Sequence, residues 1–154
     1  MLKFLPTLFA LAALGGCQPQ QPATEKPAPP TVAAPPTLAG AQCYAYAAQD
    51  TVYLTLTSTP PTATGNLIYH YAGKDRNRGT LRGTLARDTL RADYTFTSES
   101  VASVREVVFV KRGAGWSEGY GPVAERAGKT VFQHPHQLKF DTLITLKPVQ
   151  CKGR

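Results

Sequence analysis

The sequence predicts an all-β domain, an antiparallel meander of about seven to nine strands that closes into a small barrel in preference to a β-sandwich. Three observations support this fold class. Apolar and polar residues alternate with a period of two in several segments, and the breaks between these segments are short and rich in Gly and Pro. No window of useful length carries a helical apolar stripe. Closure into a barrel would leave neither edge of the sheet unpaired.

The alternation marks the strands in chain order. Val52, Leu54 and Leu56 alternate with Thr and Tyr residues over 51–57, which is typical of a half-buried strand. The same pattern predicts strands over 67–71, 81–85, 90–96, 104–111, 116–123 and 138–146. In the last of these, the apolar residues are expected on one side of the strand: Leu138, Phe140, Ile144 and Leu146. The breaks between the strands suit antiparallel hairpins.

The first 17 residues are organised like the leader of an exported protein. Lys3 supplies a positive charge, Phe4 to Leu14 are apolar apart from Pro6 and Thr7, and two glycines precede Cys17. An apolar run this short does not span a bilayer, which needs roughly 20 residues. The alternative interpretation is a core cysteine that follows a buried helix.

The run Leu14-Gly15-Gly16-Cys17 resembles the lipobox of bacterial lipoproteins. The resemblance covers residues 1–17 and implies that a signal peptide, residues 1–16, is cleaved. It also implies that Cys17 then carries fatty acyl chains such as palmitate, which anchor the protein in a membrane. Gln18 is not the aspartate that retains some lipoproteins in the inner membrane, so an outer-membrane location facing the periplasm is expected.

Composition divides the rest of the chain near residue 39. Residues 17–38, rich in Pro, Ala and Gln, predict the lipidated cysteine and a flexible tether that cannot bury enough apolar surface to fold. Residues 39–154 predict a single β-domain. Cys43 and Cys151 lie near its two ends, and a pair of cysteines in an exported protein favours a disulfide. Two free thiols or metal ligands are the alternative.

One predicted strand does not alternate cleanly. Over 103–110, a regular strand would point either Arg105 or Glu106 inward among apolar neighbours. A bulge would relieve this, or the inward charge would find a partner such as Glu99 or Arg91. We favour a bulge or a strand end at the barrel rim; the alternative is a polar cluster at the bottom of a ligand cavity.

The chain is basic, with 17 Lys and Arg against 10 Asp and Glu and a formal net charge of +7. Much of this charge gathers in one predicted hairpin region, where the side chains are expected in loops or on the solvent face: Lys74, Arg76, Arg78, Arg82 and Arg91. Such a surface attracts anionic lipids, lipopolysaccharide or an acidic envelope protein. The alternative, which we favour, is a solvated face that only keeps the protein soluble. Nucleic acid is not an expected partner, because no nucleic-acid-binding module is recognised.

Residues for catalysis and metal binding are sparse. The chain lacks a nucleophile elbow, a zinc-protease motif and a phosphate-binding glycine loop. His134 and His136 lie in a polar loop, and catalysis there would need an acid or nucleophile beside them. We therefore expect no enzyme, no metal and no cofactor. Trp116, Glu118 and Tyr120 share one face of a strand, where they would either line a sugar or peptide site or fill the core or barrel mouth.

The mature chain is similar to small uncharacterised lipoproteins of Gram-negative envelopes, which carry one compact β-domain on a tether. Some of these have lipocalin-like barrels and act by binding. The resemblance implies a non-catalytic binding or structural module that contacts anionic envelope components. The alternative is a carrier of a small apolar ligand, which would need a hollow barrel, and a hydrolase ranks behind both.

Overall fold

The computed structural model of the protein describes residues 40–74, 76–98 and 100–151. These residues form an all-β antiparallel barrel, which confirms the predicted fold class and its preferred architecture. The predicted signal peptide, Cys17 and the tether lie outside the described residues, as do Asp75 and Glu99.

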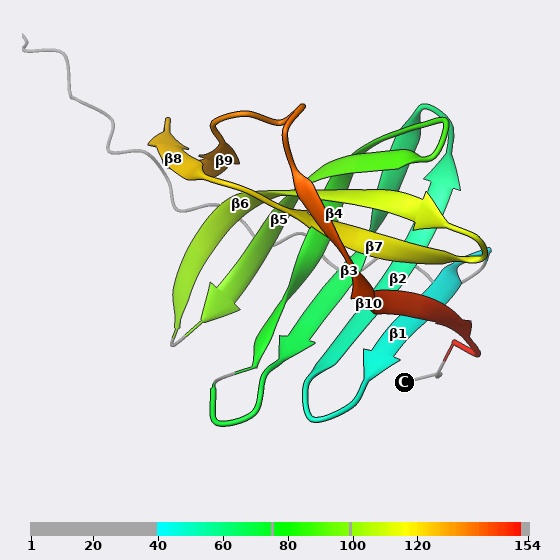
Figure 1. Ribbon diagram of the computed structural model, residues 1–154. Helices are drawn as coiled ribbons and strands as arrows, with labels where there is room; N and C mark the ends of the chain where they lie inside the picture. The colour runs from blue at the N-terminus through cyan, green and yellow to red at the C-terminus, as the bar shows by residue number, and fades with distance from the viewer. Residues whose placement is uncertain (1–39, 75, 99, 152–154) are drawn as a thin grey trace, which may run out of the picture.

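Ten strands are present in the described part of the chain, and eight of them close the barrel (Figure 1). Around the barrel the order is β5-β4-β3-β2-β1-β10-β7-β6, and a further pairing of β5 with β6 completes the circle. The barrel strands are β1 (Gln42–Ala47), β2 (Thr51–Thr59), β3 (Thr62–His70), β4 (Asn77–Ala86), β5 (Thr89–Ser98), β6 (Val101–Arg112), β7 (Gly115–Tyr120) and β10 (Lys139–Val149). The remaining two are β8 (Val123–Arg126) and β9 (Lys129–Phe132).

The first and last barrel strands meet in a short seam that a disulfide closes. Only three residue pairs are in register between β1 and β10, from Cys43–Val149 to Ala45–Lys147. Cys43 is bonded to Cys151, with Cα atoms 5.2 Å apart and 108 positions between them in sequence. The predicted disulfide is therefore present, and it joins β1 to a residue just beyond the end of β10.

Because consecutive barrel strands run antiparallel, the turns between them alternate between the two ends of the barrel. The β1–β2, β3–β4 and β5–β6 turns lie toward the bottom and the left of Figure 1, and the β2–β3, β4–β5 and β6–β7 turns lie toward the right. The disulfide is at the second end, where β1 begins and β10 ends. We call the first end, opposite the disulfide, the distal end.

The middle of the barrel is filled by side chains. Every barrel strand contributes to one buried cluster, whose fully buried members include Leu54, Leu67, Leu90, Phe109 and Leu146. Among them, Leu54, Leu67 and Leu90 are inward positions that period-two alternation predicted on β2, β3 and β5.

β8 and β9 form a hairpin beside β5 and β6. Its turn, Ala127-Gly128, has positive φ at both residues, 50° and 73°, as a type I′ turn requires. Lys129 Nζ lies 2.6 Å from Asp93 Oδ2, and the backbone N–H of Phe132 donates to Glu106 Oε2 at 3.0 Å. These two contacts tie the hairpin to the barrel wall.

This hairpin corrects the prediction of one strand over 116–123. β7 ends at Tyr120 and β8 begins at Val123, with Gly121 and Pro122 between them. Proline lacks the N–H that a sheet ladder needs, which accounts for the break.

β10 also departs from its prediction. It pairs with β7 through Phe140–Gly119 and through Leu146–Trp116, with a register shift between the two pairs. Leu146 faces the core, whereas the ring of Phe140 lies against the outer side of Gly119. The expectation that all four apolar residues of this strand share one side is wrong, because the shift moves the two halves of the strand to opposite faces.

Candidate binding site at the distal end of the barrel

Arg105 points into the barrel from β6. The ladder between β5 and β6 runs without a register shift from Thr89–Val110 to Ser98–Val101, so the favoured bulge over 103–110 is not present. Regular alternation places Arg105 on the same side as Tyr94, its inward cross-strand partner, and puts Glu106 on the outside. The sequence left two places for the inward charge, and the structure assigns it to Arg105.

The partner of Arg105 is Glu118 on β7. Arg105 Nη2 lies 3.6 Å from Glu118 Oε1. Of the two partners suggested from sequence, Arg91 forms an ion pair with Glu106 on the outer wall, and Glu99 lies outside the described residues. Glu118 was missed as a partner because β6 and β7 place these side chains together only after the strands have paired.

Two tyrosine hydroxyls hold Glu118 inside the barrel. Tyr69 donates to Oε1 at 2.6 Å, and Tyr120 donates to Oε2 at 3.5 Å. Glu118 is only 6% exposed, whereas Tyr120 is 42% exposed at the distal end. The shared face of Trp116, Glu118 and Tyr120 is thus confirmed: Trp116 fills the core, and the other two residues belong to the polar cluster.

Aromatic rings surround the Arg105 guanidinium. Its Cζ atom lies 4.8 Å from the ring centroid of Tyr69, 5.6 Å from that of Tyr94 and 6.0 Å from that of Phe96. Tyr94 and Phe96 stack on each other, and Tyr71 stacks on Tyr69. Cation–π attraction of this kind stabilises the guanidinium where water is partly excluded. We call Arg105, Glu118 and the rings of Tyr69, Tyr71, Tyr94, Phe96 and Tyr120 the distal cluster.

Burial changes the acid–base behaviour of the distal cluster. Desolvation raises the pKa of the Glu118 carboxyl, although the hydrogen bond from Tyr69 and the charge of Arg105 act against it. Desolvation, together with the charge of Glu118, raises the pKa of Tyr69 well above its usual value. The tyrosine hydroxyls are therefore protonated donors at neutral pH, as the hydrogen bonds to Glu118 require.

Arg105 keeps unused binding capacity. Its side chain is 37% exposed, and the contact with Glu118 is long for a salt bridge. Its Nε atom is buried without a hydrogen-bond partner among the described residues. A buried donor that lacks an acceptor costs about 1–3 kcal/mol, so the position favours an additional acceptor.

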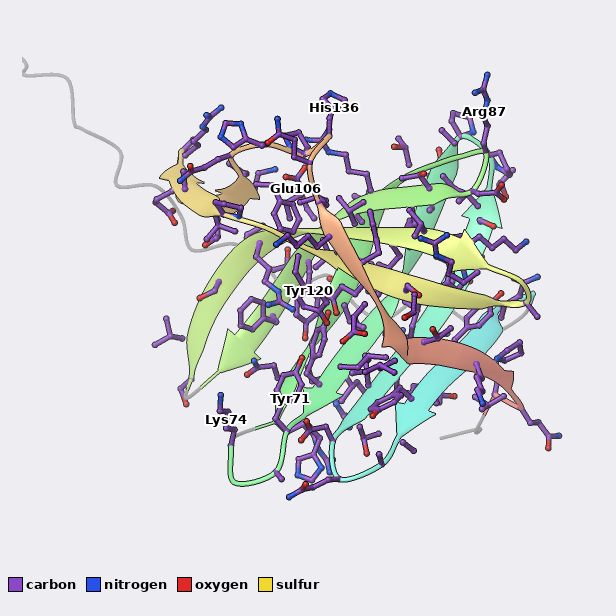
Figure 2. The ribbon with its side chains drawn as sticks, in the orientation of Figure 1. Tyr71, Lys74, Arg87, Glu106, Tyr120 and His136 are labelled. Atoms are coloured by element: carbon purple, nitrogen blue, oxygen red, sulfur yellow. A yellow bond between two sulfur atoms is a disulfide. The ribbon has the colours of Figure 1, made fainter. Side chains whose placement is uncertain are left out.

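The basic residues predicted as an anion-contact surface are exposed, as expected: Lys74, Arg76, Arg78, Arg82 and Arg91. Lys74 and Arg76 lie in the β3–β4 connection at the distal end, and Figure 2 shows Lys74 there beside Tyr71, with Arg87 at the opposite end. Arg91 is paired with Glu106. The other four, which we call the basic hairpin face, have no carboxylate within ion-pair distance among the described residues.

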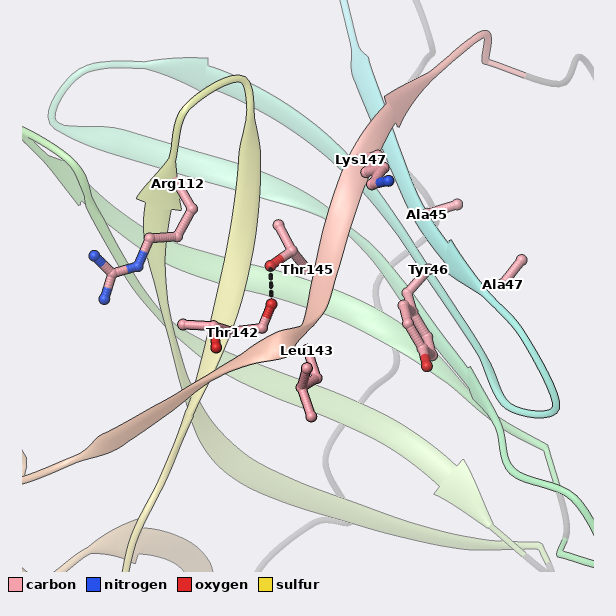
Figure 3. A pocket seen from close by; sticks show the side chains of 8 residues that line it. All are labelled: Ala45, Tyr46, Ala47, Arg112, Thr142, Leu143, Thr145 and Lys147. Atoms are coloured by element: carbon pink, nitrogen blue, oxygen red, sulfur yellow. Dashed lines mark hydrogen bonds between the residues drawn. The ribbon is translucent and has the colours of Figure 1, made fainter.

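A groove of about 690 Å³ opens elsewhere, where β10 separates from β1 (Figure 3). Tyr46, Leu143 and Thr145 line it together with Arg112 and Lys147. Thr145 Oγ1 donates to the carbonyl of Thr142 at 3.2 Å across the irregular part of β10. The groove lies on the barrel wall, outside the core, whereas a carrier of an internal ligand would need a cavity in the core.

The apolar-carrier hypothesis requires space in the barrel interior. The residues that would line such a cavity are instead packed together, and Leu54, Leu67, Tyr94 and Phe109 are fully buried. The described structure therefore favours a filled core.

His134 and His136 lie exposed in the β9–β10 connection. No acid or nucleophile is hydrogen-bonded to either side chain within the described residues. The same part of the chain contains no group of three His, Cys, Asp or Glu side chains that could hold a metal ion. Nor does it contain a helix long and apolar enough to cross a membrane.

Comparisons with protein-family models, with curated proteins and with solved structures give no match for this chain. The candidate site therefore depends on the geometry described above, which consists of a partly exposed Arg105 paired with a buried Glu118 within aromatic rings, and an exposed cationic face beside them.

Proposed function

We propose that the protein is an outer-membrane lipoprotein whose barrel acts as a non-catalytic binding module for an anionic envelope component. The carrying observation is the basic hairpin face, whose four cations are exposed and have no acidic partner among the described residues. Lipid phosphates and the phosphates of lipopolysaccharide have the charge that this face attracts.

The position of the face supports this proposal. Arg78 and Arg82 project from the outer side of β4, and Lys74 and Arg76 continue the charge toward the distal end. The described chain begins at the opposite end, next to the disulfide. A tether attached there would leave the distal end and the basic hairpin face free to meet a partner.

The test compares binding of the protein to anionic vesicles, neutral vesicles and purified lipopolysaccharide. Removing three cations with Arg76→Ser, Arg78→Ser and Arg82→Ser should weaken binding to anionic vesicles about 100-fold, since each cation near such a surface contributes about 1 kcal/mol. Added salt should have the same effect, because the Debye length falls from about 10 Å at 0.1 M to about 3 Å at 1 M.

A matched control removes three exposed cations from the opposite end, with Arg87→Ser, Lys111→Ser and Arg112→Ser. This variant has the same net charge as the first and should keep most of the binding. Equal loss in both variants would show that net charge alone acts. Absence of binding at low salt would leave the face as a solubilising surface.

The anchoring part of the proposal has its own test. Cells given labelled palmitate should incorporate it into the protein, and the Cys17→Ser variant should lose both the label and membrane association. Label retained by that variant would contradict the lipoprotein assignment.

A further inference from the structure

We propose that the distal cluster is a second binding site, in which Arg105 receives the carboxylate of a ligand whose body rests on the surrounding aromatic rings. This site lies inside the barrel mouth, on residues that the basic hairpin face does not include. The inference therefore goes beyond the proposed function and can fail independently of it.

The guanidinium has the chemistry for this role. Arginine presents a planar fork of N–H donors that matches a carboxylate, and charge-assisted pairs of this kind are among the strongest hydrogen bonds in proteins. The rings of Tyr69 and Tyr94 lie 4.8 Å and 5.6 Å from the Cζ atom of this guanidinium, and Glu118 approaches its Nη2 only to 3.6 Å. The Nε of Arg105 lacks an acceptor, and its side chain is 37% exposed. Because Nε itself is buried, an acceptor that enters from the distal end would meet the exposed part of the side chain.

Glu118 determines which anion fits. Its carboxylate stays beside Arg105 because Tyr69 binds it at 2.6 Å, so any ligand brings a second negative charge close to the first. A carboxylate adds a single charge, whereas a phosphate monoester adds about 1.5 to 2 at neutral pH. In this partly desolvated position the repulsion is weakly screened, and the carboxylate is the favoured ligand.

The rings at the mouth determine the body of the ligand. Tyr120 is 42% exposed, and Tyr71 and Phe96 are half-buried at the same end. Partly exposed aromatic rings stack on flat apolar groups. A small aromatic carboxylate therefore combines the two features that the distal cluster recognises, and the end of a peptide chain is a second source of the same chemistry.

The test uses the full chain, purified from the exporting cell in a non-ionic detergent and labelled with ¹⁵N. Phenylacetate is titrated while the backbone amide resonances of the distal cluster are followed in the wild type and in every variant, and the Nε–Hε resonance of Arg105 is followed in the wild type. N-acetylphenylalanine is the peptide-end probe. We expect a saturable shift with phenylacetate, at least tenfold weaker binding of the neutral isostere phenylacetamide, and weaker binding of phenyl phosphate. Tighter binding of the peptide-end probe would assign the ligand to a chain terminus, and tighter binding of phenylacetate would assign it to a free carboxylate.

Variants complete the test. Arg105→Gln should abolish the binding of phenylacetate, and Arg105→Lys, which keeps the charge but loses the fork, should weaken it about tenfold, as expected for one lost charge-assisted hydrogen bond. Arg112→Gln, exposed at the opposite end of the same strand, is the matched control and should bind phenylacetate normally. If the spectrum of Arg105→Gln shows that this variant is unfolded, the affinity of Arg105→Lys for phenylacetate tests the inference instead.

No saturable shift, equal binding of phenylacetamide, tighter binding of phenyl phosphate, or unchanged affinity in Arg105→Lys would each overturn the inference. Vesicle binding separates it from the proposed function. The Arg105 variants should bind anionic vesicles like the wild type, and the variant of the basic hairpin face should bind phenylacetate like the wild type.

Discussion

The disulfide between Cys43 and Cys151 should supply a large share of the stability of the barrel. The bridge closes 108 positions of chain, and in the chain-entropy model a loop of about 100 residues is worth about 4.7 kcal/mol. Domains of this kind are stable by only about 5–15 kcal/mol. The double variant Cys43→Ala/Cys151→Ala should therefore lose up to about 4.7 kcal/mol of unfolding free energy, and its melting temperature should fall by roughly 15–20 °C.

The structure adds a local expectation. The seam between β1 and β10 has only three residue pairs in register, and one of them contains Pro148, which cannot donate a backbone hydrogen bond. Loss of the bridge should therefore loosen this seam in the native state more than it loosens the long ladders of β3, β4 and β5. Amide exchange should become faster in β1 and β10 than elsewhere.

The assay is urea unfolding with hydrogen exchange, applied to the oxidised wild type, the reduced wild type and the double variant. The reduced wild type and the double variant should have the same unfolding free energy and the same exchange rates, because both lack the bridge and keep the same core. A loss below about 1 kcal/mol would refute the entropic argument. Exchange that accelerates equally in all strands would refute the argument about the seam.

Three further predictions concern the core and the distal cluster. Leu67→Ala should lower the unfolding free energy by about 2–5 kcal/mol in urea, since Leu67 is fully buried; a loss below about 1 kcal/mol would contradict a filled core. Gly79→Val should destabilise the barrel or prevent folding, because a Cβ there would lie 2.0 Å from the carbonyl oxygen of Thr95. If the variant is as stable as the wild type, β4 can move away from β5 and the argument is wrong. The pKa of Glu118 is raised in the folded state, so the folded protein binds a proton on this carboxyl more tightly than the unfolded chain does, and the group favours folding at low pH. The stability of the wild type relative to Glu118→Gln should therefore fall as pH rises from the ordinary carboxyl pKa through the raised one. Melting temperatures of both proteins from pH 4 to pH 8 measure this, and a difference that is constant or grows with pH would contradict it.

The sequence was sufficient for the fold class because the strands of this barrel are half-buried. Each buries one face in the core, so apolar residues must recur at every second position, as they do on β2, β3 and β5. The disulfide followed from cysteine count and the expectation of export, and the common face of Trp116, Glu118 and Tyr120 followed from the same alternation. The strand pattern and the common face depend on local spacing and the disulfide on the number of cysteines, and the sequence contains both.

The candidate site was only partly predictable. Alternation restricted the inward charge on β6 to Arg105 or Glu106, but both choices satisfy the pattern equally well. The decision depends on register against β5 and on the presence of Glu118 and the tyrosine rings across the barrel. These contacts join different strands, so no pattern within one strand reports them.

The sequence by itself determined the period of the strands, their approximate places, the exposure of the basic residues and the pairing of Cys43 with Cys151. Only the tertiary structure decided that β10 changes face between Phe140 and Leu146, and that β8 and β9 form a hairpin beside the barrel. It also decided that Arg105 and Glu118 meet inside. The reason is that residue spacing sets which side chains share a face of one strand, whereas register and closure set which faces meet, and a shift of a single residue exchanges the two faces.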